Sequence, residues 1–236
     1  MYQINCGKIF SLIGLTSLLT FSPIISGSLL AEEVKDGFPG RRFGGSTRSS
    51  CAVDGNNLAV LIPENNLWVT AAAYPQFYFY VPQANGSQAV EFVLRDEQDQ
   101  QVYEKTFTMT AKSGIVSLGL PEDESMLPLE SNKNYRWYLS LICNAQNRSQ
   151  DIVVEGWIQR VEVANQLSNT LDEADLKTRA KLYLEAGIWH EALSILAQLR
   201  RDYPEDDVVT DNWEKLLQSV GLDAIAQEPL VDIASF

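Results

Sequence analysis

The sequence holds few of the residues that most often carry metal or nucleophilic chemistry. One histidine, His190, and three cysteines occur among 236 residues. This scarcity of imidazole and thiolate ligands argues against a structural zinc site. No GxSxG, HExxH or phosphate-binding loop is present in the sequence. We therefore expect no metal, no cofactor and no catalytic residue.

Basic residues are also scarce. The chain has 18 Lys and Arg against 31 Asp and Glu, and its formal net charge is -13. Such a protein repels phosphate backbones, so a nucleic acid partner is not expected. Arg41, Arg42 and Arg48 form a basic cluster. They would tether the chain to an anionic polymer or to its own acidic body; a solvated linker is the alternative.

Long apolar runs are missing after residue 31. Before that point, Lys8 is followed by an uncharged apolar run over residues 9–21 and then by Pro, Ser and Gly. This pattern is typical of a secretory signal peptide, so we predict that residues 1–31 are removed, with cleavage between Leu29 and Glu33. A periplasmic or extracellular location follows. The alternative is an uncleaved membrane anchor, which would be the protein's only contact with a membrane.

Cysteine usage agrees with export. Cys51 and Cys143 remain after the leader, an even number in an oxidising compartment. We predict a structural disulfide between them. Two unrelated buried thiols remain the alternative, because the sequence does not show that the two residues meet.

Residues 51–163 repeat apolar side chains with a period of two, which is typical of strands. Residues 76–81 are apolar or aromatic on both faces, and Asn85-Gly86 is a strong turn signal. The strand-like runs are residues 58–62, 67–70, 76–81, 90–94, 103–109, 115–120, 135–143 and 152–161. This spacing predicts an antiparallel, immunoglobulin-like β-sandwich, with a small barrel as the alternative. Residues 32–50, rich in Gly and Arg, are expected to form a linker.

Residues 164–221 change to the helical period of about 3.6. Helices are predicted over 172–186, 189–203 and 208–220, so the protein is mainly β with an α appendage. Residues 222–236 are expected to be extended and weakly structured. The first helix has an apolar face too broad for one partner. We therefore predict that the helical part docks on the sandwich.

Residues 172–204 resemble a single tetratricopeptide repeat. Small residues would let two antiparallel helices approach, and a glycine would make the turn between them. A lone repeat cannot bury its own face and needs a further surface. An ordinary helical hairpin is the alternative. The matching positions, which we expect to pack the hairpin, are Ala180, Tyr183, Gly187, Trp189, Ala192, Leu196 and Pro204.

Three other features carry titratable side chains. His190 lies near the turn of the predicted hairpin and is interpreted as a structural or surface residue. Glu91 and Glu155 would form a glycosidase pair only if about 5 or 9 Å apart; a solvated strand face is the simpler interpretation. Residues 96–99 (DEQD) lack the spaced pattern of a calcium loop and predict a solvated hairpin turn.

Eight short motifs occur in order along the chain. They are residues 40–45 (GRRFGG), 81–82 (VP), 91–94 (EFVL), 114–118 (GIVSL), 135–138 (YRWY), Cys143, 155–161 (EGWIQRV) and 185–189 (EAGIW). Together they resemble the cyanobacterial domain of unknown function 928 family. The resemblance implies a secretory leader and a cyanobacterial envelope setting, and it implies no activity.

These observations predict an exported, non-catalytic binding or scaffolding protein of the periplasm or cell envelope. Its partner would be a protein or an envelope polymer. The alternative is a secreted carbohydrate-active hydrolase that uses paired carboxylates on the sandwich.

Overall fold

The computed structural model describes residues 37–44, 53–54, 57–84, 88–109, 112–123 and 125–231. The predicted leader with its cleavage site, Cys51 and Arg48 lie outside these ranges. Within them, no helix is long and apolar enough to cross a membrane.

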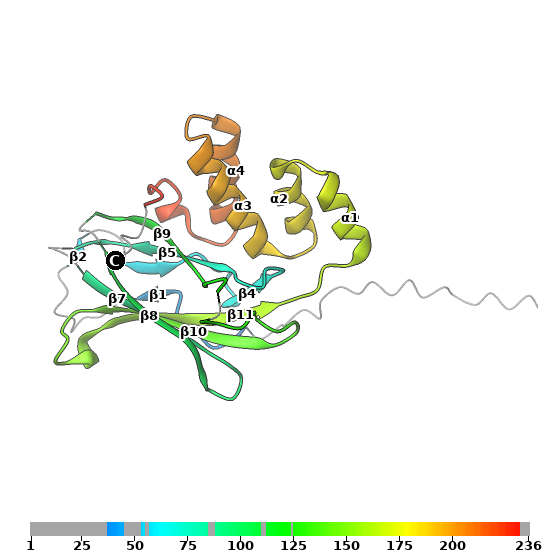
Figure 1. The fold of residues 1–236 in the computed structure, drawn as a ribbon. Coiled ribbons are helices and arrows are strands. Elements are labelled where there is room, and N and C mark those ends of the chain that lie inside the picture. Colours follow the sequence, from blue (N-terminus) through cyan, green and yellow to red (C-terminus); the bar gives the residue numbers. More distant parts are fainter. Residues whose placement is uncertain are drawn as a thin grey trace, which may run out of the picture. The chain divides into compact units, whose positions relative to one another are not determined.

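The strands of the described chain form two larger sheets and one short pair (Figure 1). One sheet has the order β1-β3-β5-β9, the other β4-β11-β10-β7-β8, and β2 pairs with β6. The strands are β1 (Phe43–Gly44), β2 (Val53–Asp54), β3 (Leu58–Val60), β4 (Leu67–Thr70), β5 (Gln76–Val81), β6 (Gln83–Ala84), β7 (Gln88–Arg95), β8 (Gln101–Met109), β9 (Gly114–Gly119), β10 (Asn134–Ile142) and β11 (Ile152–Arg160). Each run predicted from the period of two contains or overlaps one of these strands.

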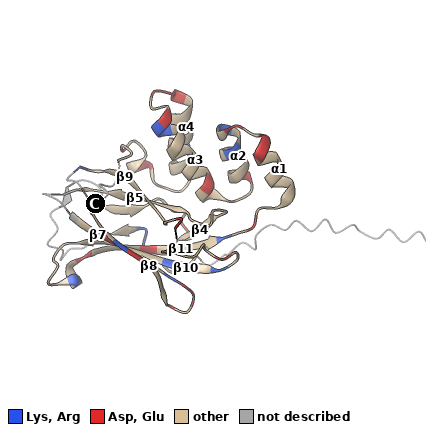
Figure 2. Ribbon diagram, in the orientation of Figure 1, with Lys and Arg blue, Asp and Glu red and all other residues tan. Residues whose placement is uncertain are grey.

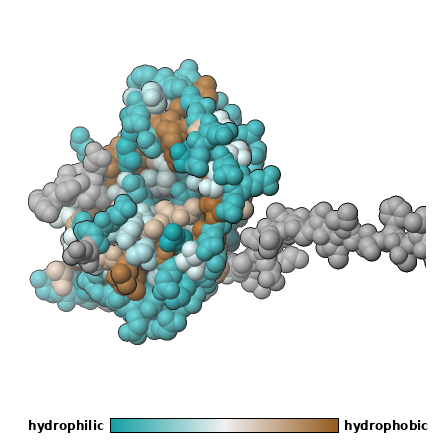
Figure 3. Space-filling model, turned by 45° about the vertical axis from the view of Figure 1, so that its right-hand side comes forward, coloured by the Kyte–Doolittle hydropathy of each residue, from teal (hydrophilic) through white to brown (hydrophobic). Residues whose placement is uncertain are grey.

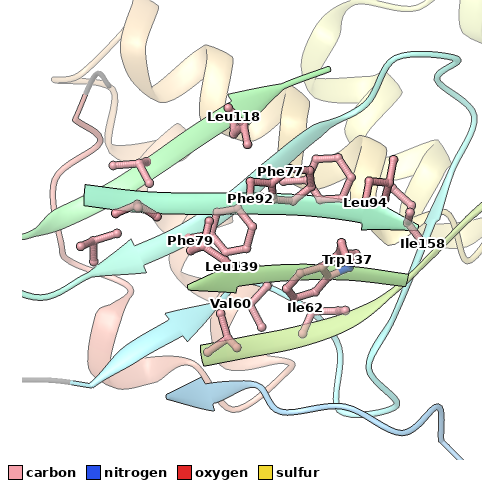
Figure 4. Packing of buried hydrophobic residues seen from close by; sticks show 14 of the residues in the cluster. Val60, Ile62, Phe77, Phe79, Phe92, Leu94, Leu118, Trp137, Leu139 and Ile158 are labelled. Carbon is pink, nitrogen blue, oxygen red and sulfur yellow. The ribbon is translucent and has the colours of Figure 1, made fainter. Parts of the chain in front are cut away.

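The two larger sheets share an aromatic core. Phe77 and Phe79 of β5 point inward and meet Phe92 of β7 and Trp137 of β10 (Figure 4). The ring centroids of Phe77 and Phe92 lie 4.7 Å apart, and those of Phe79 and Trp137 lie 5.6 Å apart. This alternation of inward and outward side chains is the physical basis of the period of two. We call the two larger sheets together the two-sheet body.

The direction of one strand differs from the prediction. β4 pairs with β11 in parallel, from Leu67 opposite Trp157 to Thr70 opposite Arg160. The other described strand pairs are antiparallel. The prediction of a purely antiparallel sandwich was therefore wrong at β4, the edge strand of the five-stranded sheet. Hydrophobic alternation carries no information about strand direction, and these two strands lie far apart in the sequence.

The helices are α1 (Asn165–Glu173), α2 (Leu176–Glu185), α3 (Trp189–Asp202) and α4 (Asp207–Gln218), followed by the short 3-10 helix η2 (Asp223–Ile225). The prediction of a single helix over 172–186 was wrong, because the helical conformation is interrupted between α1 and α2. The Asp175 carboxylate caps α2 by accepting the Thr178 amide at 2.8 Å. These hydrogen bonds lower the pKa of Asp175. We call α1–α4 and η2 together the helical unit.

The helical unit packs on the outer face of the four-stranded sheet (Figure 1). Tyr78 and Tyr80 alternate with Phe77 and Phe79 on β5 and belong to a second core, which contains Trp213 of α4. The four-stranded sheet is thus covered on both faces. This confirms the prediction that the helical part docks on the sheets.

The segment after α4 is ordered as far as it is described. Leu222 and Ala226 are buried, and the Trp213 indole donates to the Ala226 carbonyl at 2.9 Å. The Ile115 amide donates to the Pro229 carbonyl at 2.7 Å. The prediction of a weakly structured tail was wrong for residues 222–231. The segment covers the otherwise open edge of β9, whose backbone groups need partners.

Residues 37–44 do not behave as a linker. The Arg41 amide donates to the Glu155 carbonyl at 2.9 Å, and β1 pairs with β3. The Phe38 ring lies 5.4 Å from the Trp157 ring. The prediction of a linker was therefore wrong for residues 37–44, because their backbone hydrogen-bonds to the sheets. Residues 45–50 lie outside the described ranges.

We predict that Gly156→Ala destabilises the protein. A Cβ atom at this position would lie 2.6 Å from Cζ2 of the buried Trp137 ring. Overpacking of this kind costs about 1–3 kcal/mol in the free energy of unfolding, measured by chemical denaturation. Gly119→Ala is the matched control, because its nearest atom would lie at 3.8 Å, in ordinary contact. Equal stability of the two variants would contradict the close packing of β10 and β11.

Candidate functional site

The first turn of α3 holds the helical unit on the two-sheet body through one carboxylate. Oε1 of Glu191 accepts the Thr70 hydroxyl at 2.5 Å and the amides of Ala71 and Ala72 at 2.9 and 3.2 Å. Thr70 is fully buried at the end of β4. Backbone groups just beyond a strand end need partners, and a charged acceptor is a strong one. The pattern of the sequence had not singled out Glu191 as a site residue.

His190 lies beside this contact and is buried rather than at the surface. Its ring is 5.1 Å from Trp68 and 6.1 Å from Tyr78, and its exposed fraction is 1%. Neither ring nitrogen has a hydrogen-bond partner of normal geometry in the described part of the chain. Burial lowers the pKa of His190 to about 4, although the Glu191 carboxylate and the Gln76 backbone oppose the shift. The imidazole is therefore neutral at pH 7.

A groove on the helical unit combines apolar side chains with lysines. It has a volume of about 360 Å³. We call it the lysine groove; it is lined by Lys177, Ala180, Lys181, Leu184, Leu196, Asn212, Lys215, Leu216 and Ser219. Figure 2 shows basic positions on both α2 and α4, and Figure 3 shows hydrophobic surface among the helices bordered by hydrophilic residues. Leu184 is 40% exposed.

Lysine is concentrated in this groove. The chain has eight lysines, and three of them line the groove. Lys177 contacts Asp206 at 2.7 Å, Lys215 contacts Asp211 at 3.3 Å, and Lys181 contacts Glu185 at 3.7 Å. Ion pairs that are this exposed contribute little to stability, so a ligand carboxylate can replace the acidic partner at little cost.

The positions predicted to pack the hairpin lie in α2, in α3, in the turn that joins these helices, or just after α3. Gly187 has a φ of 75°, which only glycine adopts without strain, and so makes the turn. Helices α2 and α3 pack together as a helical hairpin. Buried members are Ala180, Tyr183, Ala192 and Leu196, whereas Trp189 is half-buried and Pro204 is exposed after α3.

The described members of the arginine cluster lie on the protein itself. Nη2 of Arg42 donates to the Val220 carbonyl, just beyond α4, at 2.6 Å. Burial lowers the pKa of Arg42, while Glu64 opposes the shift. Arg41 is exposed and pairs through its backbone with Glu155. Arg42 thus ties the N-terminal segment to the helical unit.

Cys143 follows β10 and packs against the core between the sheets. Cys51 is outside the described residues, so the Cys51–Cys143 disulfide stays a prediction.

The two carboxylates considered for hydrolysis lie on one outward face of the five-stranded sheet. Glu91 of β7 and Glu155 of β11 face outward on the two strands that flank β10. Two strand spacings separate their backbones by roughly 10 Å. Arg148 binds Glu91 at 2.9 Å, and Arg136 binds Glu155 at 2.7 Å. Each carboxylate is therefore paired with a guanidinium, and Arg148 also binds Asp151.

The acidic turn after β7 is stabilised by its own backbone. Oδ1 of Asp96 accepts the amides of Gln98 and Gln100 at 2.9 and 2.8 Å. Among the described residues, no group of three or more His, Cys, Asp or Glu is placed to hold a metal ion. The turn thus has the local hydrogen bonds expected of a solvated hairpin.

Residues 43–230 match the family described as Domain of Unknown Function (DUF928). The chain belongs to the DUF928 family. The match begins at β1 and ends where the tail meets β9, so a DUF928 domain includes both sheets and the helical unit. This confirms the resemblance carried by the eight motifs. Among curated proteins, none matches this chain.

Lowering the pH from about 6.5 to about 4 is predicted to destabilise this DUF928 protein. The unfolded state binds a proton on His190 below its ordinary pKa of 6.5, whereas the folded state resists protonation down to about 4. Stability is therefore lost as the pH falls through this window, by up to about 3 kcal/mol from His190.

The measurement is the free energy of unfolding against pH for the parent and for His190→Gln, which removes the His190 contribution. His190 is the only histidine, so its imidazole NMR signal titrates without overlap. A pKa near 6.5 in the folded protein would contradict the prediction.

Proposed function

We propose that this DUF928 protein is an exported, non-catalytic scaffolding protein of a cyanobacterial envelope, and that its helical unit binds a short acidic segment of a partner protein. The observation that carries the proposal is the lysine groove, where apolar and basic side chains meet on an otherwise acidic protein. Export rests on the leader pattern of residues 1–31. A periplasmic or extracellular location follows from it.

The proposed architecture is an immunoglobulin-like sandwich that presents a tetratricopeptide-like hairpin. The hairpin of α2 and α3 has two apolar sides to cover. One side packs with the sheet and α4. The other side lines the groove with Leu184 and Leu196, together with Leu216 of α4. Leu184 is partly exposed there. A helical repeat of this kind leaves such a surface for a partner.

The chemistry of the groove selects one kind of segment. An aliphatic or aromatic side chain of the partner would contact Leu184 and bury its exposed area. Carboxylates on either side would pair with Lys181 and Lys215, displacing the exposed acids that hold these ammonium groups in the free protein. The overall charge of -13 repels acidic partners at long range, so binding requires contact with these lysines.

The hydrolase alternative has weaker support. A glycosidase needs one protonated and one ionised carboxyl group across the scissile bond. Glu91 and Glu155 are instead each held by an arginine on an outward sheet face.

We predict that reversing two groove charges weakens the binding of acidic peptides. An array of short peptides that combine Asp or Glu with one large apolar residue is probed with the full mature protein. Lys181→Glu with Lys215→Glu should weaken the best peptides at least about tenfold, because two attractive contacts become repulsive.

Lys105→Glu with Lys133→Glu is the matched control, since both lysines are exposed on the body and the net charge changes equally. Binding that is lost equally in the control would refute the groove as the site. Fractionation of source cells tests export, and full-length protein recovered from the cytoplasm would refute that part.

A further inference from the structure

A cavity of about 360 Å³ lies between α3 and β5, apart from the lysine groove. Glu191, Ser194, Gln198 and Arg201 line it from one stripe of α3, at the spacing that places side chains on one helix face. Leu196, which belongs to the lysine groove, lies on a different face. The volume is at the lower end of the range for small-molecule sites.

The side chains of this cavity form a connected polar set. The Tyr78 hydroxyl donates to Oε1 of Gln76 at 3.1 Å, and Nη2 of Arg201 donates to the Ser117 hydroxyl at 2.9 Å. Burial raises the pKa of Tyr78, while the Ser194 hydroxyl and the Arg201 guanidinium beside it oppose the rise. Hydroxyls and amides each donate and accept hydrogen bonds, so they complement groups that do the same.

His190 supplies a second, independent sign of a site. Its ring lines the cavity and is 1% exposed, and neither nitrogen has a hydrogen-bond partner of normal geometry among the described residues, although the Gln76 backbone lies near enough to oppose slightly the lowering of its pKa by burial. Buried polar atoms in folded proteins nearly always find a partner. Since the nitrogens are closed off in this structure, a ligand reaches them only when the floor of the cavity adjusts.

We propose that this cavity binds a single saccharide unit, a neutral ring compound that carries several hydroxyl groups. Gln76, Tyr78, Ser194 and Gln198 match hydroxyl groups as both donors and acceptors. The half-buried Tyr74 offers an aromatic surface to the apolar face of the ring. Glu191 and Arg201 carry opposite charges, so the lining disfavours a strongly anionic or cationic ligand.

The site extends the proposed function and does not depend on the lysine groove. The saccharide unit is either free or the end of an envelope polysaccharide, and both present the same hydroxyl chemistry. A scaffolding protein with both sites would join a polymer to a partner protein.

The test follows the imidazole NMR signals of His190 in the full mature protein. The probes are methyl glucoside, methyl galactoside, methyl N-acetylglucosaminide and their short oligosaccharides, each raised to about 20 mM, well above a millimolar Kd. We expect at least one sugar to shift the His190 signals to saturation. Tighter binding of an oligosaccharide would identify a polymer end as the source, and equal binding would identify the free sugar.

Ser194→Ala with Gln198→Ala should raise the Kd of that sugar about tenfold, because two hydrogen bonds are lost. Gln218→Ala, an exposed change on α4, should leave it unchanged. Failure of every sugar to shift the signals would overturn the proposal, as would a Kd that is the same in the double variant. A saturable shift with inorganic phosphate in place of the sugars would also overturn it. If the double variant fails to fold, the titration of the parent protein alone decides.

Discussion

The carboxylate of Glu191 is the interaction on which the arrangement of this molecule depends. It accepts the buried Thr70 hydroxyl and two backbone amides at the end of β4. Hydrogen bonds to a charged group are worth about 1.5–3 kcal/mol, and donors left unsatisfied in a buried place cost a similar amount. This contact fixes the first turn of α3 at the end of β4, on the edge of the five-stranded sheet. The orientation of α3 then places His190, Ser194 and Arg201 around the cavity between α3 and β5, and it places Leu196 in the lysine groove. Both proposed sites therefore follow from one anchored helix.

The four-stranded sheet, which lies between the five-stranded sheet and the helices, explains why the helical unit and the two-sheet body form one structure. β5 sends Phe77 and Phe79 into the core between the sheets and Tyr78 and Tyr80 into the core beneath the helices. Removing the helical unit would expose the tyrosine face. This requirement was visible in the sequence, because residues 76–81 are apolar or aromatic at every position after Gln76. The strands and the hairpin were predictable for the same reason: alternation, turns and the glycine at position 187 act over a few neighbouring residues.

The features that sequence analysis missed mostly depend on residues far apart in the chain. The parallel pairing of β4 with β11, the hydrogen bond of Arg42 to Val220 and the tail along β9 each join segments that no local pattern connects. The lysine groove is similar, since Lys215 joins Lys177 and Lys181 only when α4 packs beside the hairpin. The break before α2 is different: Asp175 three residues before Thr178 is a readable capping signal. The role of Glu191 had a weaker signal, an acid in the first helical turn, which is favourable anywhere and names no partner.

The most direct test of this account is native-state hydrogen exchange at the amides of Ala71 and Ala72. We expect both amides to be protected in the parent protein. In Glu191→Ala they should lose at least about tenfold protection, together with the amides of α3, because their charged acceptor is removed. A tenfold loss corresponds to about 1.4 kcal/mol. Glu185→Ala, at the exposed end of α2, should leave these amides unchanged. Full protection of Ala71, Ala72 and α3 in Glu191→Ala would contradict the claim that this carboxylate holds the helical unit in place.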